Sequence, residues 1–137
     1  MSRPGVSAAE PTVGMTLFDQ KSNAIIFDTN FWHWRAIVEA IRSLAVLPDS
    51  RVDALHEQFV GDLTEEEAQV VAAAVRGLTA TLRDDERLLL DGRRTTEPDD
   101  GTFFRDPAEQ HKNYGTNRAV LEEFARCCES CGGFRVS

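Results

Sequence analysis

The sequence predicts a single helix-rich α+β domain, with about four to five helices and a small β-sheet. Three observations lead to this fold class. The chain has 137 residues, of which 42% are hydrophobic and 8% aromatic, which is an ordinary composition for one globular domain. Several segments carry apolar residues at helical spacing. Between them lie short apolar runs bounded by turn residues, which are typical of strands.

The first 15 residues are rich in Pro, Gly, Ser and Ala and show no periodicity. This composition is typical of a flexible tail. We therefore expect residues 1–15 to form such a tail and residues 16–137 to form the globular domain. Met15 lies where the predicted tail ends, and it is a candidate alternative start of the protein.

The ordered part is expected to open with a buried strand, Ala24-Ile25-Ile26-Phe27, which ends at Asp28-Thr29-Asn30. A helix from about Phe31 to Val46 follows, because its apolar residues form one stripe at helical spacing. The stripe consists of Trp34, Ile37, Val38, Ile41, Leu44 and Ala45.

Two more helices are expected before the middle of the chain. Pro48 ends the previous helix, and Asp49 or Ser50 is expected to cap a short one with the apolar face Val52, Leu55 and Phe59. The run Thr64-Glu65-Glu66-Glu67 is a capping box, and it predicts a helix that extends to about Leu82.

The C-terminal part is expected to contain two strands, a loop and the last helix. Leu88-Leu89-Leu90 reads as a strand, and residues 91–107 form a polar loop in which Pro98-Asp99-Asp100-Gly101 has the chemistry of a turn. A helix from about Thr116 to Cys131 follows, and Phe134-Arg135-Val136 is the last predicted strand.

Charge excludes some partners. The chain has 15 Lys and Arg against 23 Asp and Glu, for a formal net charge of −8. Residues 62–109 hold 13 of the 23 acidic residues but only 6 of the 15 basic ones. An acidic excess argues against nucleic-acid binding by counterion release. It fits a protein partner with a basic surface, and it fits equally a charge that only keeps the protein soluble.

Membrane insertion and secretion are not expected either. No apolar run approaches the roughly 18 residues that a membrane-spanning helix needs. The N-terminus lacks the apolar region of a secretory signal, and three cysteines do not make a disulfide framework. The sequence therefore predicts a cytoplasmic protein with reduced thiols.

The three cysteines lie near the end of the last predicted helix. Cys128 and Cys131 form a C-x-x-C pair, but at a helix C-terminus the dipole opposes the thiolate that redox chemistry needs. Zinc would require further ligands, and no second C-x-x-C pair is present. Val120, Phe124, Cys127 and Cys131 share one helix face, so core packing is the favoured interpretation and no cofactor is predicted.

The apolar strand followed by Asp28-Thr29-Asn30 resembles the opening of PIN-domain endoribonucleases. In that family the Asp is the first of several carboxylates that hold a divalent metal for phosphodiester hydrolysis. The resemblance implies a parallel sheet and a metal site formed by Asp28, Glu39 and Asp99 or Asp100. Asp28-Thr29-Asn30 also fits a helix cap, which is the alternative interpretation.

Candidate binding residues are Trp32, Arg35, Asp99, Asp100 and Tyr114. Trp32 falls on the charged side of its helix with Arg35, so it is either covered by a loop or exposed as a contact residue. Asp99 and Asp100 could bind calcium or magnesium, but their loop lacks the regular ligand spacing of an EF-hand. A surface turn is the favoured interpretation. Tyr114 is the only tyrosine, in a turn that leads into the last helix.

Four segments together resemble a family of short bacterial proteins with no assigned activity. They are Asn30-Phe31-Trp32-His33-Trp34-Arg35, Glu97-Pro98-Asp99-Asp100-Gly101, His111-Lys112-Asn113-Tyr114 and Cys131-Gly132-Gly133-Phe134. No catalytic constellation is visible, so we expect a small binding or accessory protein rather than an enzyme. An immunity- or antitoxin-like role is one form of this hypothesis, and a metal-dependent endoribonuclease is the alternative. The sequence does not predict the oligomeric state.

Overall fold

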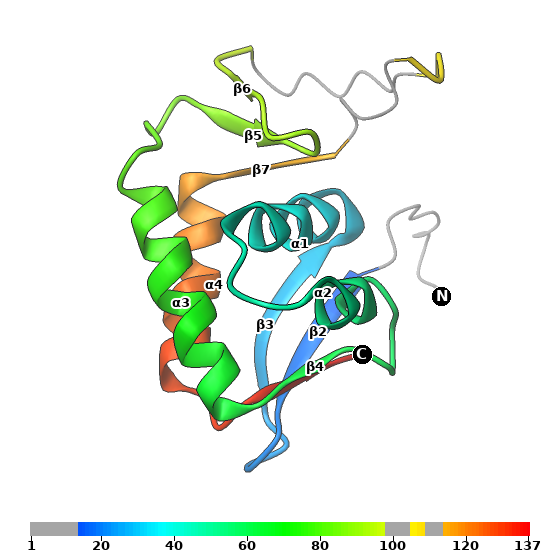
Figure 1. The fold of residues 1–137 in the computed structure, drawn as a ribbon, viewed down its shortest axis with the longest axis vertical. Coiled ribbons are helices and arrows are strands. Elements are labelled where there is room, and N and C mark those ends of the chain that lie inside the picture. The colour runs from blue at the N-terminus through cyan, green and yellow to red at the C-terminus, as the bar shows by residue number, and fades with distance from the viewer. Residues whose placement is uncertain (1–13, 98–104, 109–113) are drawn as a thin grey trace, which may run out of the picture.

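The computed structural model describes residues 14–97, 105–108 and 114–137. It confirms the predicted α+β class, because the described part contains four helices and two small antiparallel sheets (Figure 1). No helix in these ranges combines the length and the apolarity that crossing a bilayer requires.

The larger sheet has the strand order β3-β2-β8-β4, and all its pairs are antiparallel. Its strands are β2 (Gly14–Asp19), β3 (Ile25–Asn30), β8 (Phe134–Val136) and β4 (Asp62–Leu63). The strands β3 and β8 were predicted, but β3 runs on to Asn30 and only Phe27 in it is buried. The strand β2 was not predicted, and Met15 is fully buried within it. The strand begins at Gly14, slightly before the predicted start of the domain at residue 16.

Helix α1 (Phe31–Leu44) follows β3 directly, as predicted. The side chain of Asn30 caps it by accepting a hydrogen bond from the His33 backbone N–H at 3.0 Å. Ala45 ends the helix in the left-handed conformation. The buried Trp34 donates its indole N–H to the Leu55 carbonyl at 2.8 Å, which ties α1 to the next helix.

Helix α2 (Asp49–Leu55) is shorter than its apolar pattern predicted. Pro48 is its N-cap, and neither Asp49 nor Ser50 caps it, because the helix already begins at Asp49. The predicted apolar face is wrong at Phe59, whose exposed fraction is 82%. Phe59 lies beyond the helix, where the backbone turns toward β4, so helical spacing does not apply to it.

Helices α3 (Glu65–Thr79) and α4 (Arg118–Ser130) pack side by side (Figure 1). The predicted capping box is present, with Glu67 N–H to Thr64 Oγ1 at 3.1 Å and the reciprocal bond at 2.9 Å. The helix α3 ends at Thr79 rather than near Leu82, but Leu82 is still buried.

A second sheet covers one end of the helices with the order β6-β5-β7. Its strands are β5 (Arg87–Leu89), β6 (Arg94–Thr95) and β7 (Gly115–Asn117). The hairpin between β5 and β6 turns at Gly92, inside the segment predicted as a polar loop. The turn predicted at Pro98–Gly101 lies outside the described residues.

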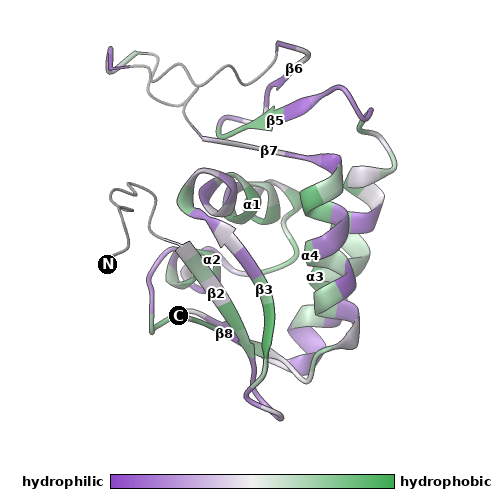
Figure 2. Cartoon of the chain, turned by 180° about the vertical axis from the view of Figure 1, so that it is seen from behind, coloured by the Kyte–Doolittle hydropathy of each residue, from purple (hydrophilic) through white to green (hydrophobic). Residues whose placement is uncertain are grey.

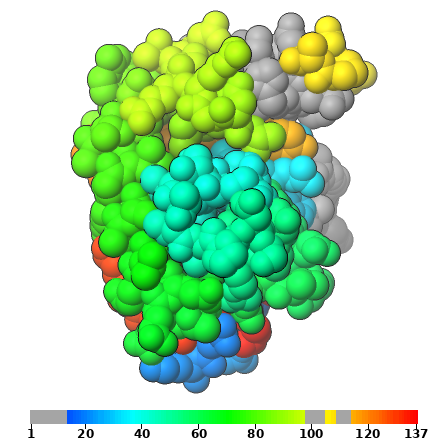
Figure 3. Space-filling view, in the orientation of Figure 1, coloured from blue at the N-terminus to red at the C-terminus, as the bar shows by residue number. Residues whose placement is uncertain are grey.

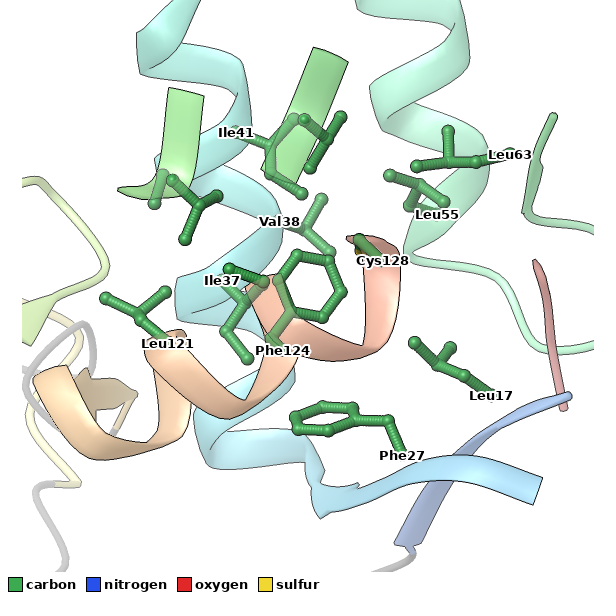
Figure 4. Close-up of a cluster of buried hydrophobic side chains, with 14 of the residues drawn as sticks. Leu17, Phe27, Ile37, Val38, Ile41, Leu55, Leu63, Leu121, Phe124 and Cys128 are labelled. Carbon is green, nitrogen blue, oxygen red and sulfur yellow. The ribbon is translucent and has the colours of Figure 1, made fainter. Parts of the chain in front are cut away.

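The core lies between the larger sheet and the helices, and Phe124 stands at its centre (Figure 4). The Phe124 ring contacts the rings of Phe27, Trp34 and Phe134, with centroid distances of 5.6, 5.9 and 6.2 Å. The predicted stripe of α4 is right at Phe124, but α4 buries Leu121 and Cys128 where Val120 and Cys127 were expected, and those two are only half-buried. Cys131 is buried just beyond the helix end.

Candidate functional site

Three of the five predicted binding residues come together in one patch, which we call the Trp32 patch: Trp32, Arg35 and Tyr114. The rings of Trp32 and Tyr114 lie 5.0 Å apart at an interplanar angle of 43°. The Arg35 guanidinium lies over the Tyr114 ring, 5.3 Å from its centroid. Because Arg35 is exposed and the two rings are half-buried, the patch presents a cation above a supported aromatic surface.

The position of the patch follows from the packing of β7 against the first turns of α1. Trp32 and Arg35 belong to α1, and Tyr114 directly precedes β7. The same two elements are joined by a 3.1 Å hydrogen bond between His33 Nδ1 and the buried Thr116 hydroxyl. Trp32 and Arg35 are therefore held on α1, and Tyr114 directly before a strand that packs against α1, which pre-organises the patch for binding.

The carboxylates of the predicted metal site do not form one cluster among the described residues. Asp28 accepts a hydrogen bond from the Thr16 hydroxyl at 3.1 Å, and Glu39 is bound to Arg42 and His56. No group of three or more potential metal ligands occurs in the described ranges. Asp99 and Asp100 lie outside them, so their part in either predicted site stays a prediction.

Glu39 is the centre of a charge network that the sequence analysis did not predict. Its carboxylate accepts hydrogen bonds from Arg42 Nε at 3.0 Å and from His56 Nε2 at 2.7 Å. Arg42 also binds Asp49 at 3.1 Å and Asp53 at 2.5 Å. The network links α1 to α2, and only the i,i+3 pair of Glu39 and Arg42 carried a sequence signal.

The Glu39 network makes a pH dependence of stability testable. Partial burial by itself would raise the pKa of Glu39, but hydrogen bonds from His56 and Arg42 outweigh it and lower that pKa below its ordinary value. The ionised carboxylate therefore stabilises the fold above the unfolded-state pKa, and this contribution is lost as the pH falls through the lower folded-state pKa.

We expect Glu39→Gln to lower the free energy of unfolding at neutral pH and to have a smaller effect in acid. Urea denaturation of both proteins across the acidic range measures this. The exposed Glu123 of α4 provides the control, as Glu123→Gln should leave the curve unchanged. An equal loss for Glu39→Gln at all pH values would contradict the expected linkage.

A cleft of about 500 Å³ opens where α1, the end of α3 and the β5–β6 hairpin meet, three elements that lie together in Figure 3. Leucines of α3 and β5 form part of its lining, among them Leu78 and Leu88. Glu39, Arg42 and Arg94 contribute charges of both signs. Its volume is in the range of small-molecule sites, but its lining does not select one class of ligand.

The thiols are poorly suited to nucleophilic or redox chemistry. Burial raises the pKa of Cys127 and of Cys131, and it raises the pKa of Cys128 well above the ordinary value. The Cys127 thiol donates to the Ile26 carbonyl at 2.8 Å, so it fastens α4 to β3. These contacts support the packing interpretation.

In the native protein at mildly alkaline pH, we expect a disulfide reagent such as DTNB to label only Cys127, and slowly. Cys128 and Cys131 should react only after unfolding, because both are buried. The absorbance of the released thiolate measures the rates, and Cys127→Ser should leave the native protein almost unlabelled. Rapid reaction of all three thiols would show that the end of α4 opens readily.

Bases from elsewhere in the chain partly neutralise the acidic segment of residues 62–109. Arg51 of α2 binds Asp62 at 3.0 Å and Glu67 at 2.6 Å, and Lys21 binds Glu65 at 2.6 Å. These pairs are solvent-accessible and contribute little to stability. They do, however, reduce the negative charge at the start of α3. The net charge of the whole chain is therefore a better guide to the electrostatic attraction of a partner than the charge of residues 62–109 alone.

Comparisons of the chain with protein-family models, curated proteins and solved structures find no match. The geometry of the described residues therefore carries the functional argument.

Proposed function

We propose that the chain is a small cytoplasmic binding protein that docks a partner protein on the Trp32 patch. The observation that carries the proposal is the layered arrangement of Trp32, Tyr114 and Arg35. Trp, Tyr and Arg are the residue types most enriched among the energetically dominant residues of protein interfaces. Here residues 82 positions apart in sequence present all three types within one surface.

The geometry supports binding in two further ways. Trp32 lies on α1 and Tyr114 directly before β7, and the two half-buried rings contact each other, so little side-chain freedom remains to be lost on association. The Arg35 guanidinium lies over the Tyr114 ring while the side chain is exposed, so its five N–H donors are accessible to acceptors of a partner.

The partner we propose has a basic surface outside the area covered by Arg35. The formal net charge of −8 draws such a partner toward the chain and raises the association rate at low salt. Sequestering a basic protein is the mode of action expected of an immunity- or antitoxin-like protein. In this division of roles, the acidic surface steers the encounter and the Trp32 patch determines the lifetime of the complex.

The test is affinity capture from the native host with the tagged chain at low and high salt, followed by a binding assay with the captured protein. We expect Arg35→Ala or Trp32→Ala to weaken binding by about 30-fold, which corresponds to about 2 kcal/mol. Arg126→Ala is the matched control, because Arg126 is also an exposed helical arginine, on α4.

Two outcomes would contradict the proposal. One is capture of no partner at either salt concentration. The other is a partner whose affinity is unchanged by both Arg35→Ala and Trp32→Ala in proteins whose thermal unfolding matches the wild type. Because Arg35 is exposed, its variant keeps the test informative even if Trp32→Ala destabilises the fold.

The metal-dependent endoribonuclease remains an alternative prediction. The antiparallel sheets differ from the parallel sheet that the PIN resemblance implies. RNA incubated with Mg²⁺ or Mn²⁺ and either the wild type or Asp28→Asn tests it directly. Cleavage by the wild type that Asp28→Asn abolishes would favour the nuclease over the binding protein.

A further inference from the structure

The turn between α2 and β4 carries two adjacent apolar side chains in solvent. Phe59 has an exposed fraction of 82%, and Val60 after it one of 60%. We call these two residues the Phe59 knuckle. The other large exposed apolar side chains of the described residues, Ile25 and Val70, stand singly on β3 and α3. The turn lies at the edge of the molecule opposite α3 and α4 (Figure 1, Figure 2).

Hydrogen bonds hold the backbone of the knuckle on both sides. The Phe59 N–H donates to the Val136 carbonyl of β8 at 2.9 Å, and the Val136 N–H donates to the Gly61 carbonyl at 2.8 Å. The N–H groups of Val60 and Gly61 both donate to the Glu57 carbonyl, at 3.2 and 3.1 Å. The two side chains are therefore presented from a fixed backbone, so that little order has to be gained when a partner binds.

Neither the backbone conformation nor burial explains a phenylalanine at position 59. Its φ is 66°, in the left-handed region, which glycine and asparagine adopt at a lower cost than a bulky side chain. An aromatic side chain stabilises a fold through the apolar area that it buries, and this ring buries little. A strained aromatic residue whose ring stays in solvent points to a surface used for contact.

The charge beside the knuckle indicates the charge of the partner. Residues 49–62 contain four carboxylates, and three of them are paired with arginines. The fourth belongs to Glu57, which is exposed and forms no ion pair within the part of the chain that the structure describes. A lysine or arginine of a partner would therefore meet an uncompensated carboxylate two residues before the exposed ring.

We propose that the Phe59 knuckle inserts into an apolar pocket of a partner protein, and that a lysine or arginine at the edge of this pocket pairs with Glu57. An aromatic side chain seated in a pocket is the usual centre of such a contact. A second copy of the chain, with its own net charge of −8, or an anionic membrane surface would face Glu57 with like charge. The knuckle shares no residue with the Trp32 patch, so this contact is additional to the proposed function and does not depend on it.

Photocrosslinking of the whole chain in the native host tests the proposal. The photoreactive amino acid p-benzoylphenylalanine replaces Phe59 in one protein and Val70 in the matched control, since Val70 is an exposed apolar residue of α3. We expect position 59 to crosslink a partner protein about tenfold more strongly than position 70, at apolar residues next to a lysine or arginine. A product no stronger than the control, or a crosslink to lipid or to a second copy of the chain, would overturn the proposal.

Two variants separate a contact from a structural role. Because asparagine tolerates the left-handed region, Phe59→Asn should leave the thermal unfolding midpoint unchanged or higher. Its affinity for the crosslinked protein should fall by about tenfold or more. Glu57→Gln should also weaken binding, and it should reduce the salt dependence of the association rate.

A lower unfolding midpoint for Phe59→Asn would overturn the proposal, because it would show that the ring stabilises the fold. An affinity that either variant leaves unchanged would overturn it as well. Trp32→Ala and Arg35→Ala test the proposed function separately, since neither residue belongs to the knuckle.

Discussion

Replacing Phe124 with alanine is expected to lower the free energy of unfolding by about 3–5 kcal/mol, the usual range for removing a buried aromatic side chain. Phe124 is fully buried, and its ring makes edge-to-face contacts with three other rings. Those rings come from β3, α1 and β8, so the cavity would loosen three elements at once. Urea denaturation followed by circular dichroism measures the change.

Two controls separate this loss from a general effect on helix α4. Phe124→Leu keeps most of the apolar volume and should cost less than the alanine variant. Val120→Ala, one turn earlier on the same helix and only half-buried, should cost clearly less again. If Val120→Ala were as costly as Phe124→Ala, the aromatic cluster would not be the centre of the core.

The helices that the sequence predicted well are those with strong local signals. Asn30 and Thr64 cap their helices in the structure, and the apolar stripe of α1 is buried from Trp34 to Ile41. At the helix end the predicted stripe is wrong, because Leu44 is only half-buried and Ala45 is exposed. Periodicity failed where the chain left the helix, at Phe59, and it missed the phase of α4 by one residue at Cys128. Apolar spacing alone did not distinguish the three closely placed cysteines.

The candidate site was predictable by residue type but not by arrangement. Trp32 and Arg35 were identified because both fall on the charged side of one helix, whereas their contact with Tyr114 depends on β7 packing against α1. The link between Glu39 and His56 likewise joins residues brought together by the turn between α1 and α2. Contacts between residues this far apart produce no periodic pattern in the sequence from which they could be predicted.

Strand β2 of the larger sheet could not be predicted from local sequence either. Its residues Gly14–Asp19 alternate between the two faces, but they follow directly on a segment with the composition of a tail. Their partners are β3 and the C-terminal β8, which lies more than a hundred residues away. The strand is stabilised by this non-local pairing rather than by local propensity.

The point where β8 meets the start of α3 gives the second large expected effect. Gly133 has φ of +89°, which favours glycine, and a Cβ atom built there would lie 2.7 Å from the Leu63 carbonyl oxygen and 3.0 Å from the Glu65 nitrogen. Both contacts are with backbone, which cannot rotate away as a side chain can. We expect Gly133→Ala to destabilise the protein by about 3 kcal/mol or more, from backbone strain and steric overlap together.

The matched control is the same substitution at Gly77, inside helix α3. A Cβ atom there would meet no atom within 4 Å, and the helix interior disfavours glycine. Gly77→Ala should therefore raise the free energy of unfolding by about 0.5–1 kcal/mol, so the two variants should shift the denaturation midpoint in opposite directions. A neutral Gly133→Ala would mean that β8 can move away from the capping box of α3, and that the larger sheet and this helix are not rigidly joined.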